Sequence, residues 1–261
     1  MTIALISAVA ASGLTSPPKH TEKEERPARE RTTAKTAKRS LPETKQVKSQ
    51  DSSAAIVPVV IEHGDRSSMK AALTFDACED RQPAGYDEEI IEILTSTKVP
   101  ATLFLGGKWI SSHPTEAKAL AENDLFELGN HSFTHLDFTM IETQQARQEI
   151  RDTQKHLHTL NGKQAKFFRF PFGRYDQGTV DLVASEGLRA IQWDVVTGAP
   201  DPNVTAGTII RAVETRAKSG SIIIMHMNGR GWNTAEALPA IIDNSRAKGL
   251  ELVKLSDLLS D

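Results

Sequence analysis

Several side chains that can bind a metal or move a proton stand directly behind, or within, short apolar runs of the sequence. These residues are Asp76, His131, His135, Arg169, Asp194 and His226. In a parallel α/β barrel the carboxyl ends of all strands open on one face, where active sites are built. Core packing does not explain why polar residues from distant parts of the chain share this position. The pattern therefore predicts one site on one face of the fold.

His131 and His135 are four residues apart in the segment His-Ser-Phe-Thr-His. On a helical turn, imidazoles at this spacing lie on one side and can chelate one ion. Taken alone, the spacing is more typical of two surface histidines after a Gly-Asn turn than of a metal site. Ser132 stands where the zinc-protease signature His-Glu-x-x-His has glutamate, which argues against a peptidase. A catalytic zinc normally has a third protein ligand and an open position.

Arg169 lies among the three phenylalanines of residues 167–170, and its charge is permanent. Such a guanidinium needs a partner, and the carboxylate of Asp76 suits its fork. The alternative is an arginine whose head reaches solvent at a strand end. His226 follows the apolar run at residues 222–225. A histidine there is often structural, but the same position suits an acid with a tuned pKa.

Apolar runs alternate with segments of helical period from residue 57 onward, and about seven strand-then-helix units follow one another. The predicted strands span residues 71–75, 101–105, 125–128, 167–170, 190–193, 221–225 and 251–253. The predicted helices span residues 86–97, 115–122, 142–160, 180–186, 206–218 and 234–247, before a final short helix. This alternation predicts parallel strands covered by helices, either as a barrel smaller than eight units or as a doubly wound open sheet.

The composition permits a folded core and excludes several classes of protein. The chain has 261 residues, of which 39% are hydrophobic and 25% charged, and it contains one cysteine. One cysteine excludes a disulfide within the chain and a zinc site made of cysteines alone. No strand is followed by a glycine-rich phosphate-binding pattern, which argues against a nucleotide ligand. No apolar run reaches the length of a membrane-spanning helix.

The first 55 residues differ from the rest of the chain. Residues 1–15 form an apolar run containing Ala8-Val9-Ala10, which predicts a signal peptide that lacks a basic start, or else a short apolar tip. Residues 16–55 carry 10 Lys+Arg against 6 Asp+Glu and few large apolar side chains, which predicts a disordered charged linker. Residues 56–261 carry 21 basic against 28 acidic residues, so nucleic acid is not an expected partner. We therefore expect an exported protein, periplasmic or extracellular, with one folded domain at residues 56–261.

Four motifs follow one another in a recognisable order. Thr74-Phe75-Asp76, His131 to His135, Arg169-Phe-Pro-Phe-Gly173 and Ile224-Met225-His226 resemble the motif series of the polysaccharide deacetylases. These are the family four carbohydrate esterases, which share the nodulation-type deacetylase domain. The resemblance covers residues 71–259. It implies a distorted (β/α)7 barrel, similar to a TIM barrel, and metal-assisted removal of acetyl groups from N-acetylglucosamine units of polysaccharides.

The resemblance also implies roles for individual residues. His131 and His135 resemble ligands of Zn²⁺ or of another divalent metal such as Co²⁺. Asp76 resembles the base that acts on the metal-bound water, and Arg169 the residue that orients it. His226 resembles the acid that protonates the leaving amine. A metal ion that activates water, with a carboxylate and an imidazole dividing the proton transfers, is a sound way to hydrolyse an amide.

Three further residues resemble substrate-binding positions. The backbone N–H of Phe172 would help to hold the oxyanion, and Ile224 with Trp232 would shape the pocket for the acetyl methyl group. The expected substrate is peptidoglycan or a chitin-like polymer, and no protein partner is predicted. Two other functions remain open at this point: an O-acetyl esterase acting on xylan, and a degenerate carbohydrate-binding protein without activity.

The first motif departs from the family pattern at its metal ligand. Ala77 stands where the family usually has a second aspartate as third ligand. The place of this ligand is expected to be taken by water, Glu79 or Asp80, or else the metal binds weakly. Cys78 is a further, softer donor, although a small buried cysteine is more often structural.

The fourth region of the family pattern departs as well. Val196 and Ala199 stand where the family usually has aspartates. Asp194 and Asp201 are the nearest carboxylates that could take over the orientation of Arg169 or the tuning of His226.

Overall fold

The structure, a computed structural model, describes residues 56–79 and 84–260. The predicted signal peptide at residues 1–15 and the predicted linker at residues 16–55 lie outside this part of the chain. Within it, no helix combines the length and the apolar character needed to cross a bilayer.

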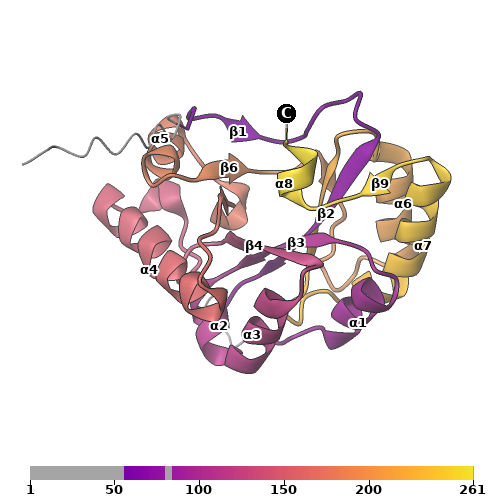
Figure 1. The fold of residues 1–261 in the computed structure, drawn as a ribbon, viewed down its shortest axis with the longest axis horizontal. Helices are drawn as coiled ribbons and strands as arrows, with labels where there is room; N and C mark the ends of the chain where they lie inside the picture. Colours follow the sequence, from indigo (N-terminus) through magenta and orange to yellow (C-terminus); the bar gives the residue numbers. More distant parts are fainter. Residues whose placement is uncertain (1–55, 80–83, 261) are drawn as a thin grey trace, which may run out of the picture. The chain divides into compact units, whose positions relative to one another are not determined.

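A curled parallel sheet forms the centre of the described fold (Figure 1). The strands run side by side in the order β1-β6-β5-β4-β3-β2-β8-β7, and β9 pairs with the beginning of β2. Their bounds are β1 Val60–Ile61, β2 Lys70–Ala77, β3 Ala101–Leu105, β4 Phe126–Asn130, β5 Phe167–Phe168, β6 Arg189–Ile191, β7 Val195–Val196, β8 Ile222–His226 and β9 Glu251–Leu252. Because all of these pairings are parallel, the strands end at one common edge.

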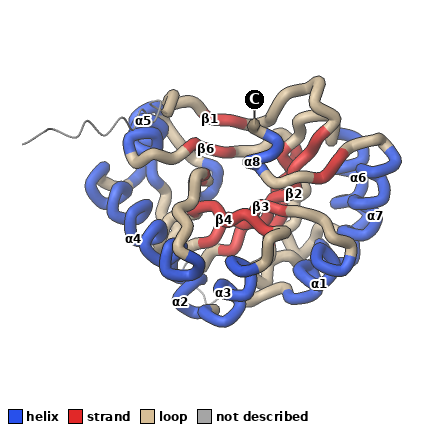
Figure 2. Tube along the Cα trace, in the orientation of Figure 1, coloured by secondary structure: helices blue, strands red, loops and turns tan. Residues whose placement is uncertain are grey.

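Helices surround the strands, as the blue and red segments of Figure 2 show. Their bounds are α1 Glu88–Ser96, α2 Gly107–Ser112, α3 Pro114–Glu122, α4 Thr143–Asn161, α5 Gln177–Ser185, α6 Ala206–Arg216, α7 Thr234–Ala247 and α8 Leu255–Leu258. The predicted α/β class and barrel-like architecture are confirmed. Among the described strands the sheet ends at β1 and β7, so it is a curled, incomplete barrel.

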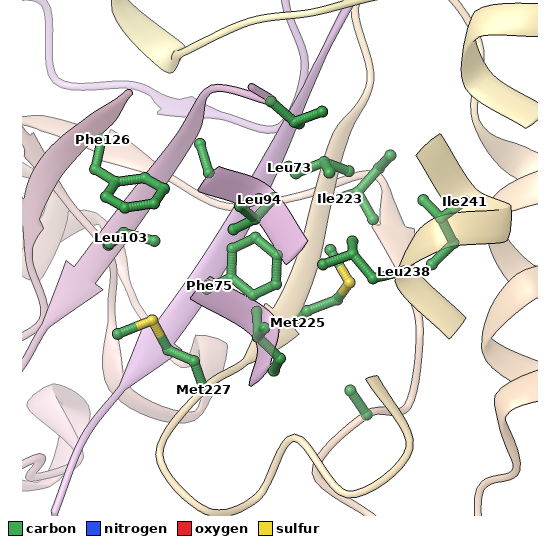
Figure 3. Packing of buried hydrophobic residues seen from close by; sticks show 14 of the residues in the cluster. Leu73, Phe75, Leu94, Leu103, Phe126, Ile223, Met225, Met227, Leu238 and Ile241 are labelled. Atoms are coloured by element: carbon green, nitrogen blue, oxygen red, sulfur yellow. The ribbon is translucent and has the colours of Figure 1, made fainter. Parts of the chain in front are cut away.

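Strand β2 shows how the sequence separates the two faces of the sheet. Side chains of a strand point alternately to opposite faces. Leu73, Phe75 and Ala77 are fully buried between the sheet and the outer helices. Figure 3 shows the ring of Phe75 beside Leu94 of α1, in the same cluster as side chains of β8 and α7. Asp76 therefore points to the other face, toward the inside of the curled sheet.

The inside of the sheet is apolar near the amino ends of the strands. Ala72 and Phe167 pack there with Leu255 and Leu258 of α8, and Phe104, nearer the carboxyl ends, belongs to the same cluster. The first residue of α8 is hydrogen-bonded to β3: the N–H of Leu255 donates to Thr102 Oγ1 at 3.0 Å. The amino end is thus filled, and the carboxyl end is left for the polar residues.

Most predicted elements exist, with shifted ends. The strand expected at residues 167–170 stops at Phe168, and Arg169 follows it. Strand β7 and helix α2 were not predicted, since both are short and depend on neighbours that are distant in sequence. The predicted stripe of α4 is buried at Ala146, Ile150, Thr153 and Leu157, whereas Leu160 is only half-buried.

Candidate active site

Asp76 and Arg169 form a buried ion pair at the carboxyl end of the sheet. Arg169 Nη1 donates to Asp76 Oδ1 at 2.7 Å, and the two side chains are 0% and 4% exposed. The guanidinium also lies 4.0 Å above the centre of the Phe104 ring. Burial raises the pKa of Asp76, but the charge and hydrogen bond of Arg169 outweigh it, so this pKa lies below its usual value. Asp76 is therefore an ionised carboxylate, and the structure provides the partner expected for Arg169.

His131 lies on the other side of Asp76. Its Nε2 is 3.6 Å from Asp76 Oδ2, and its Nδ1 is 2.9 Å from the carbonyl oxygen of Arg169. A carbonyl only accepts, so Nδ1 carries the hydrogen and Nε2 has its lone pair directed into the site. Burial also lowers the pKa of His131, with Asp76 acting in the opposite direction. A neutral imidazole held in this tautomer is suited to bind a metal.

His135 reaches the same place through a loop and not through a helical turn. Ser132 and His135 both have positive φ, at 62° and 57°, which breaks any helical path. The two imidazole rings nevertheless lie 4.9 Å apart between centroids. The helical-turn interpretation of this spacing is therefore wrong, although the expected approach of the rings is found.

Glu149 of α4 holds this loop, and only its position beside the buried stripe of α4 could have pointed to it in the sequence. Its Oε2 accepts from the backbone N–H groups of Phe133 and Thr134 at 2.9 and 2.6 Å, and its Oε1 accepts from Thr134 Oγ1 at 2.7 Å. Asn130 adds a second anchor, since its Oδ1 accepts from the N–H of Ser132 at 3.0 Å. Buried carboxylates of this kind fix backbone geometry through charge-assisted hydrogen bonds.

His226 is the last residue of β8 and lies opposite Asp76 in the register of the parallel pair β2–β8. Burial lowers the pKa of His226 to about 4, with Asp76 acting in the opposite direction. The imidazole is therefore neutral at pH 7. Ile224, two residues earlier on the same face of the strand, is 7% exposed.

A cavity of about 290 Å³ brings most of the predicted residues together. Its lining includes Asp76, Cys78, His131, His135, Phe172, Ile224 and His226. Phe172 has φ of 59°, and its ring lies edge-on to His135 at 4.5 Å. Trp232 is 56% exposed and lies at the rim, where its Nε1 donates to the carbonyl oxygen of Pro200 at 3.3 Å. Pro200 lines the cavity, so Trp232 is next to it but not part of its wall.

Three side chains around this cavity could hold a metal ion. One ligand atom each from Cys78, His131 and His135 lie within 4.8 Å of one another. Imidazole nitrogen and thiolate sulfur are the donors that zinc prefers, so these residues fit such an ion. Glu79 is turned elsewhere, since its Oε2 accepts from Ser112 Oγ at 2.8 Å. Asp80 lies outside the described residues.

The expected replacements for the family's fourth-region aspartates do not lie where the sequence interpretation put them. Asp194 lies at the amino end of β8, where its Oδ2 pairs with Arg66 at 2.8 Å and its Oδ1 accepts from the N–H of Ile222 at 2.9 Å. The expectation that Asp194 joins the site is wrong. Asp194 directly precedes β7, and β7 starts beside Ile223, near the amino end of β8. Asp201 accepts from Asn203 and is exposed. Among the described contacts, Arg169 is oriented by Asp76, Gln192 and the Phe104 ring.

Comparisons with known sequences point to one family. A family model described as polysaccharide deacetylase matches residues 63–191. The peptidoglycan-N-acetylglucosamine deacetylase of Bacillus cereus is 28% identical over 197 residues, which are 75% of this chain and 70% of that protein. The uncharacterized protein YlxY of Bacillus subtilis is 28% identical over 179 residues, which are 67% of this chain. The aligned part spans 54% of YlxY, about half of its length.

Solved structures share the fold over most of the chain. The Bc1960 peptidoglycan N-acetylglucosamine deacetylase superposes with a TM-score of 0.71 at 27% identity, covering 77% of this chain and 92% of that one. A mutant of BA3943, a Bacillus anthracis protein, superposes with a TM-score of 0.70 at 25% identity, covering 78% and 72%. That mutant is described as a CE4 family pseudoenzyme with restored enzymatic activity. The family-model match over residues 63–191, the shared fold and these relatives together support the assignment of this chain to the polysaccharide deacetylase family.

Proposed function

We propose that this protein is a metal-dependent hydrolase that removes N-acetyl groups from N-acetylglucosamine-containing polysaccharide, peptidoglycan or a chitin-like polymer. The observation that carries the proposal is the position of Asp76. This carboxylate is held by Arg169 on one oxygen, while the other oxygen faces His131 and the cavity. A base fixed beside a metal-binding imidazole is what hydrolysis of an amide by activated water needs.

In the proposed reaction the chain's own residues bind, orient and move protons. Zn²⁺ held by His131 and His135, or Co²⁺ in its place, supplies Lewis acidity toward the acetyl carbonyl and lowers the pKa of a water molecule. Asp76 takes a proton from that water through its Oδ2. The oxygen of the deprotonated water bonds to the acetyl carbon, and the carbon–nitrogen bond breaks as His226 donates a proton to the amine nitrogen. The neutral imidazole of His226 takes up this proton from solvent beforehand. Arg169 keeps Asp76 ionised and fixed in place.

The apolar wall of the cavity is the proposed binding surface for the acetyl group of the substrate. Ile224 forms a small apolar surface for the acetyl methyl group, and Trp232 extends it at the rim. The backbone N–H of Phe172 is proposed to stabilise the oxyanion. The positive φ of Phe172 is a backbone conformation that non-glycine residues seldom adopt, and such positions often occur at functional sites.

Two observations support keeping a second candidate, a carbohydrate-binding protein without activity. Ala77 offers no ligand, and BA3943 is described as a pseudoenzyme of the same family. An O-acetyl esterase acting on xylan would use the same carboxylate and imidazoles. The substrate therefore has to be determined by experiment.

Acetate release distinguishes these functions. Purified protein is incubated with N-acetylglucosamine oligomers or with acetylated xylan, in the presence of chelator or of added zinc. We expect acetate from the N-acetylglucosamine oligomers with zinc and none with chelator. Acetate from xylan alone would indicate the esterase, and retained sugar binding without any acetate would indicate the binding protein.

Export remains part of the proposal. We infer that residues 1–15 direct the protein out of the cytoplasm and that residues 16–55 link them to the folded domain, because the proposed substrate belongs to the cell envelope. Cell fractionation of the tagged full-length protein tests this, and recovery of all protein in the cytoplasmic fraction would contradict it.

A further inference from the structure

The end of β2 turns Cys78 toward the cavity. Ala77 is fully buried in the outer cluster with Leu73 and Phe75, so its side chain faces the helices. Asp76 and Cys78, one residue before and one after, both line the cavity. This alternation follows from the period of two along an extended chain. Ala77 carries no ligand atom, and Cys78, the next residue, turns its side chain to the cavity.

Cys78 meets two imidazoles there. Its sulfur and one nitrogen each of His131 and His135 lie within 4.8 Å of one another, and small rotations bring such atoms around one ion. The His131 ring is already held by the carbonyl oxygen of Arg169, as metal-binding histidines usually are by a neighbour. Cys78 is 4% exposed, so bulk water does not compete for the sulfur.

The side-chain amide of Asn228 contacts both the backbone and the sulfur of Cys78. This buried residue follows β8, and its Nδ2 lies 2.6 Å from the carbonyl oxygen of Cys78 and 3.6 Å from its Sγ. Donation of an N–H to sulfur stabilises the negative charge of a thiolate, and such partners tune metal sites. The amide thus fixes both the backbone and the sulfur of Cys78.

We propose that Cys78 is the third protein ligand of the metal site, as a thiolate beside His131 and His135. This inference rests on the metal dependence of the proposed function. On binding, the thiol loses its proton to solvent and its sulfur forms a bond to the divalent ion. Because thiolate is a soft ligand, the site selects Zn²⁺ and Co²⁺ over Mg²⁺ and Mn²⁺.

Cobalt spectroscopy tests this ligand directly, without any measurement of activity. Cys78 is the only cysteine of the 261 residues, so a sulfur-to-Co²⁺ charge-transfer band in the near ultraviolet can come from no other thiolate. We expect this band when Co²⁺ is added to the full-length metal-free protein, together with release of about one proton from the thiol per ion. We also expect that Zn²⁺ displaces the band and that excess Mg²⁺ does not.

Variants separate the sulfur from the rest of the site. Cys78→Ser should lose the charge-transfer band and bind Zn²⁺ at least about 10-fold more weakly, because even outer partners of a site are worth roughly 10- to 100-fold. Cys78→Asp should keep a bound ion without the band. His158→Ala, which removes an exposed histidine of α4, is the control and should match wild type.

The possible results either support or overturn the proposal. Co²⁺ bound by the wild type without a charge-transfer band would overturn thiolate ligation and leave the proposed deacetylase intact. A protein that binds neither Co²⁺ nor Zn²⁺ would overturn the inference too. A band that is present in the wild type and absent from Cys78→Ser would support it even if no acetate is released, and only the proposed function would then fail.

Discussion

Asp76 and Asp194 are both paired with an arginine, but the two pairs lie at opposite ends of β8. Asp76 is in register with His226, the last residue of that strand, and Asp194 accepts from the N–H of Ile222, the first. The side chains of Asp76 and Arg169 are 4% and 0% exposed, whereas those of Asp194 and Arg66 are 16% and 33% exposed.

The two carboxylates also differ in what their oxygens contact. Both oxygens of Asp194 accept hydrogen bonds, from Arg66, from Ser221 Oγ and from a backbone N–H. Asp76 accepts from Arg169 on Oδ1, while Oδ2 faces His131 and the cavity. A carboxylate whose two oxygens both accept hydrogen bonds from the protein joins parts of a fold. One that keeps an oxygen toward a cavity can exchange a proton with a ligand.

The largest expected effect is on catalysis. Asp76→Asn keeps an oxygen for Arg169 but cannot take a proton, so turnover should fall by about 10²- to 10⁴-fold. Asp194→Asn should stay within a few-fold of wild type. Acetate release measures turnover, and urea unfolding checks that both variants are folded. Equal losses of turnover would mean that Asp76 is structural too.

Removing the arginines should separate the two pairs by stability. Arg169→Met leaves Asp76 buried without its partner, and loss of one member of such a pair costs about 3–5 kcal/mol of the free energy of unfolding. Arg66→Met should cost about 1 kcal/mol or less, because that pair is partly exposed and screened. Urea denaturation of the metal-free proteins measures both, and Arg169→Lys, which keeps the charge, should recover part of the loss. Similar losses for Arg66 and Arg169 would contradict the contrast in burial.

His226 should make the metal-free protein sensitive to acid. Its pKa is about 4 in the folded protein and 6.5 in an ordinary histidine. Between these values the unfolded chain binds a proton that the folded chain excludes, so stability is complete above pH 6.5 and falls toward pH 4. The loss amounts to at most about 3 kcal/mol, at about 1.4 kcal/mol per pH unit.

Unfolding by urea across this pH range, with chelator present, measures the effect. His226→Asn should flatten the curve but not abolish its slope, because burial also lowers the pKa of His131. His63→Asn changes an exposed ring and should follow wild type. A His226→Asn curve as steep as that of wild type would contradict the assignment.

The sequence predicted those parts of the fold that depend on local pattern. Strand β3 and helix α7 have the predicted bounds, and the buried stripe of α4 was visible in its spacing. The position of Asp76 and His226 behind apolar runs also placed them at one edge of a parallel sheet. Such features need only periodicity and the rule that parallel strands share their carboxyl ends.

Other parts of the site depend on contacts that no local pattern contains. The loop that contains the left-handed residues Ser132 and His135 is held by Glu149, which lies in another element and accepts from the residues between them. Asp194 follows an apolar run just as Asp76 does, yet it directly precedes β7 and lies at the opposite end, where it pairs with Arg66. The direction of the Cys78 side chain depends on where the extended conformation of β2 ends. Sequence spacing therefore indicated which residues come together better than it indicated how they are held.

The smallest effect should come from two glutamates that do similar work at opposite ends of the barrel. Glu149 accepts from the loop that carries His131 and His135, and Glu127 of β4 accepts from the N–H of Ser256 at 2.9 Å and from its hydroxyl. Glutamine at either position keeps one acceptor oxygen and loses the other. Each variant should therefore lose about 1 kcal/mol of the free energy of unfolding, the net worth of one typical hydrogen bond.

Only Glu149→Gln should also weaken metal binding, by up to about 10-fold, because loosening the loop releases both imidazoles. Glu127→Gln loosens α8, which closes the apolar end, and should leave zinc affinity unchanged. Competition of each protein with a zinc-binding dye measures this difference. If both variants bound zinc like wild type, Glu149 would not be needed to hold the loop. The two ends of the barrel would then differ in function only through Asp76, Arg169 and the residues that line the cavity.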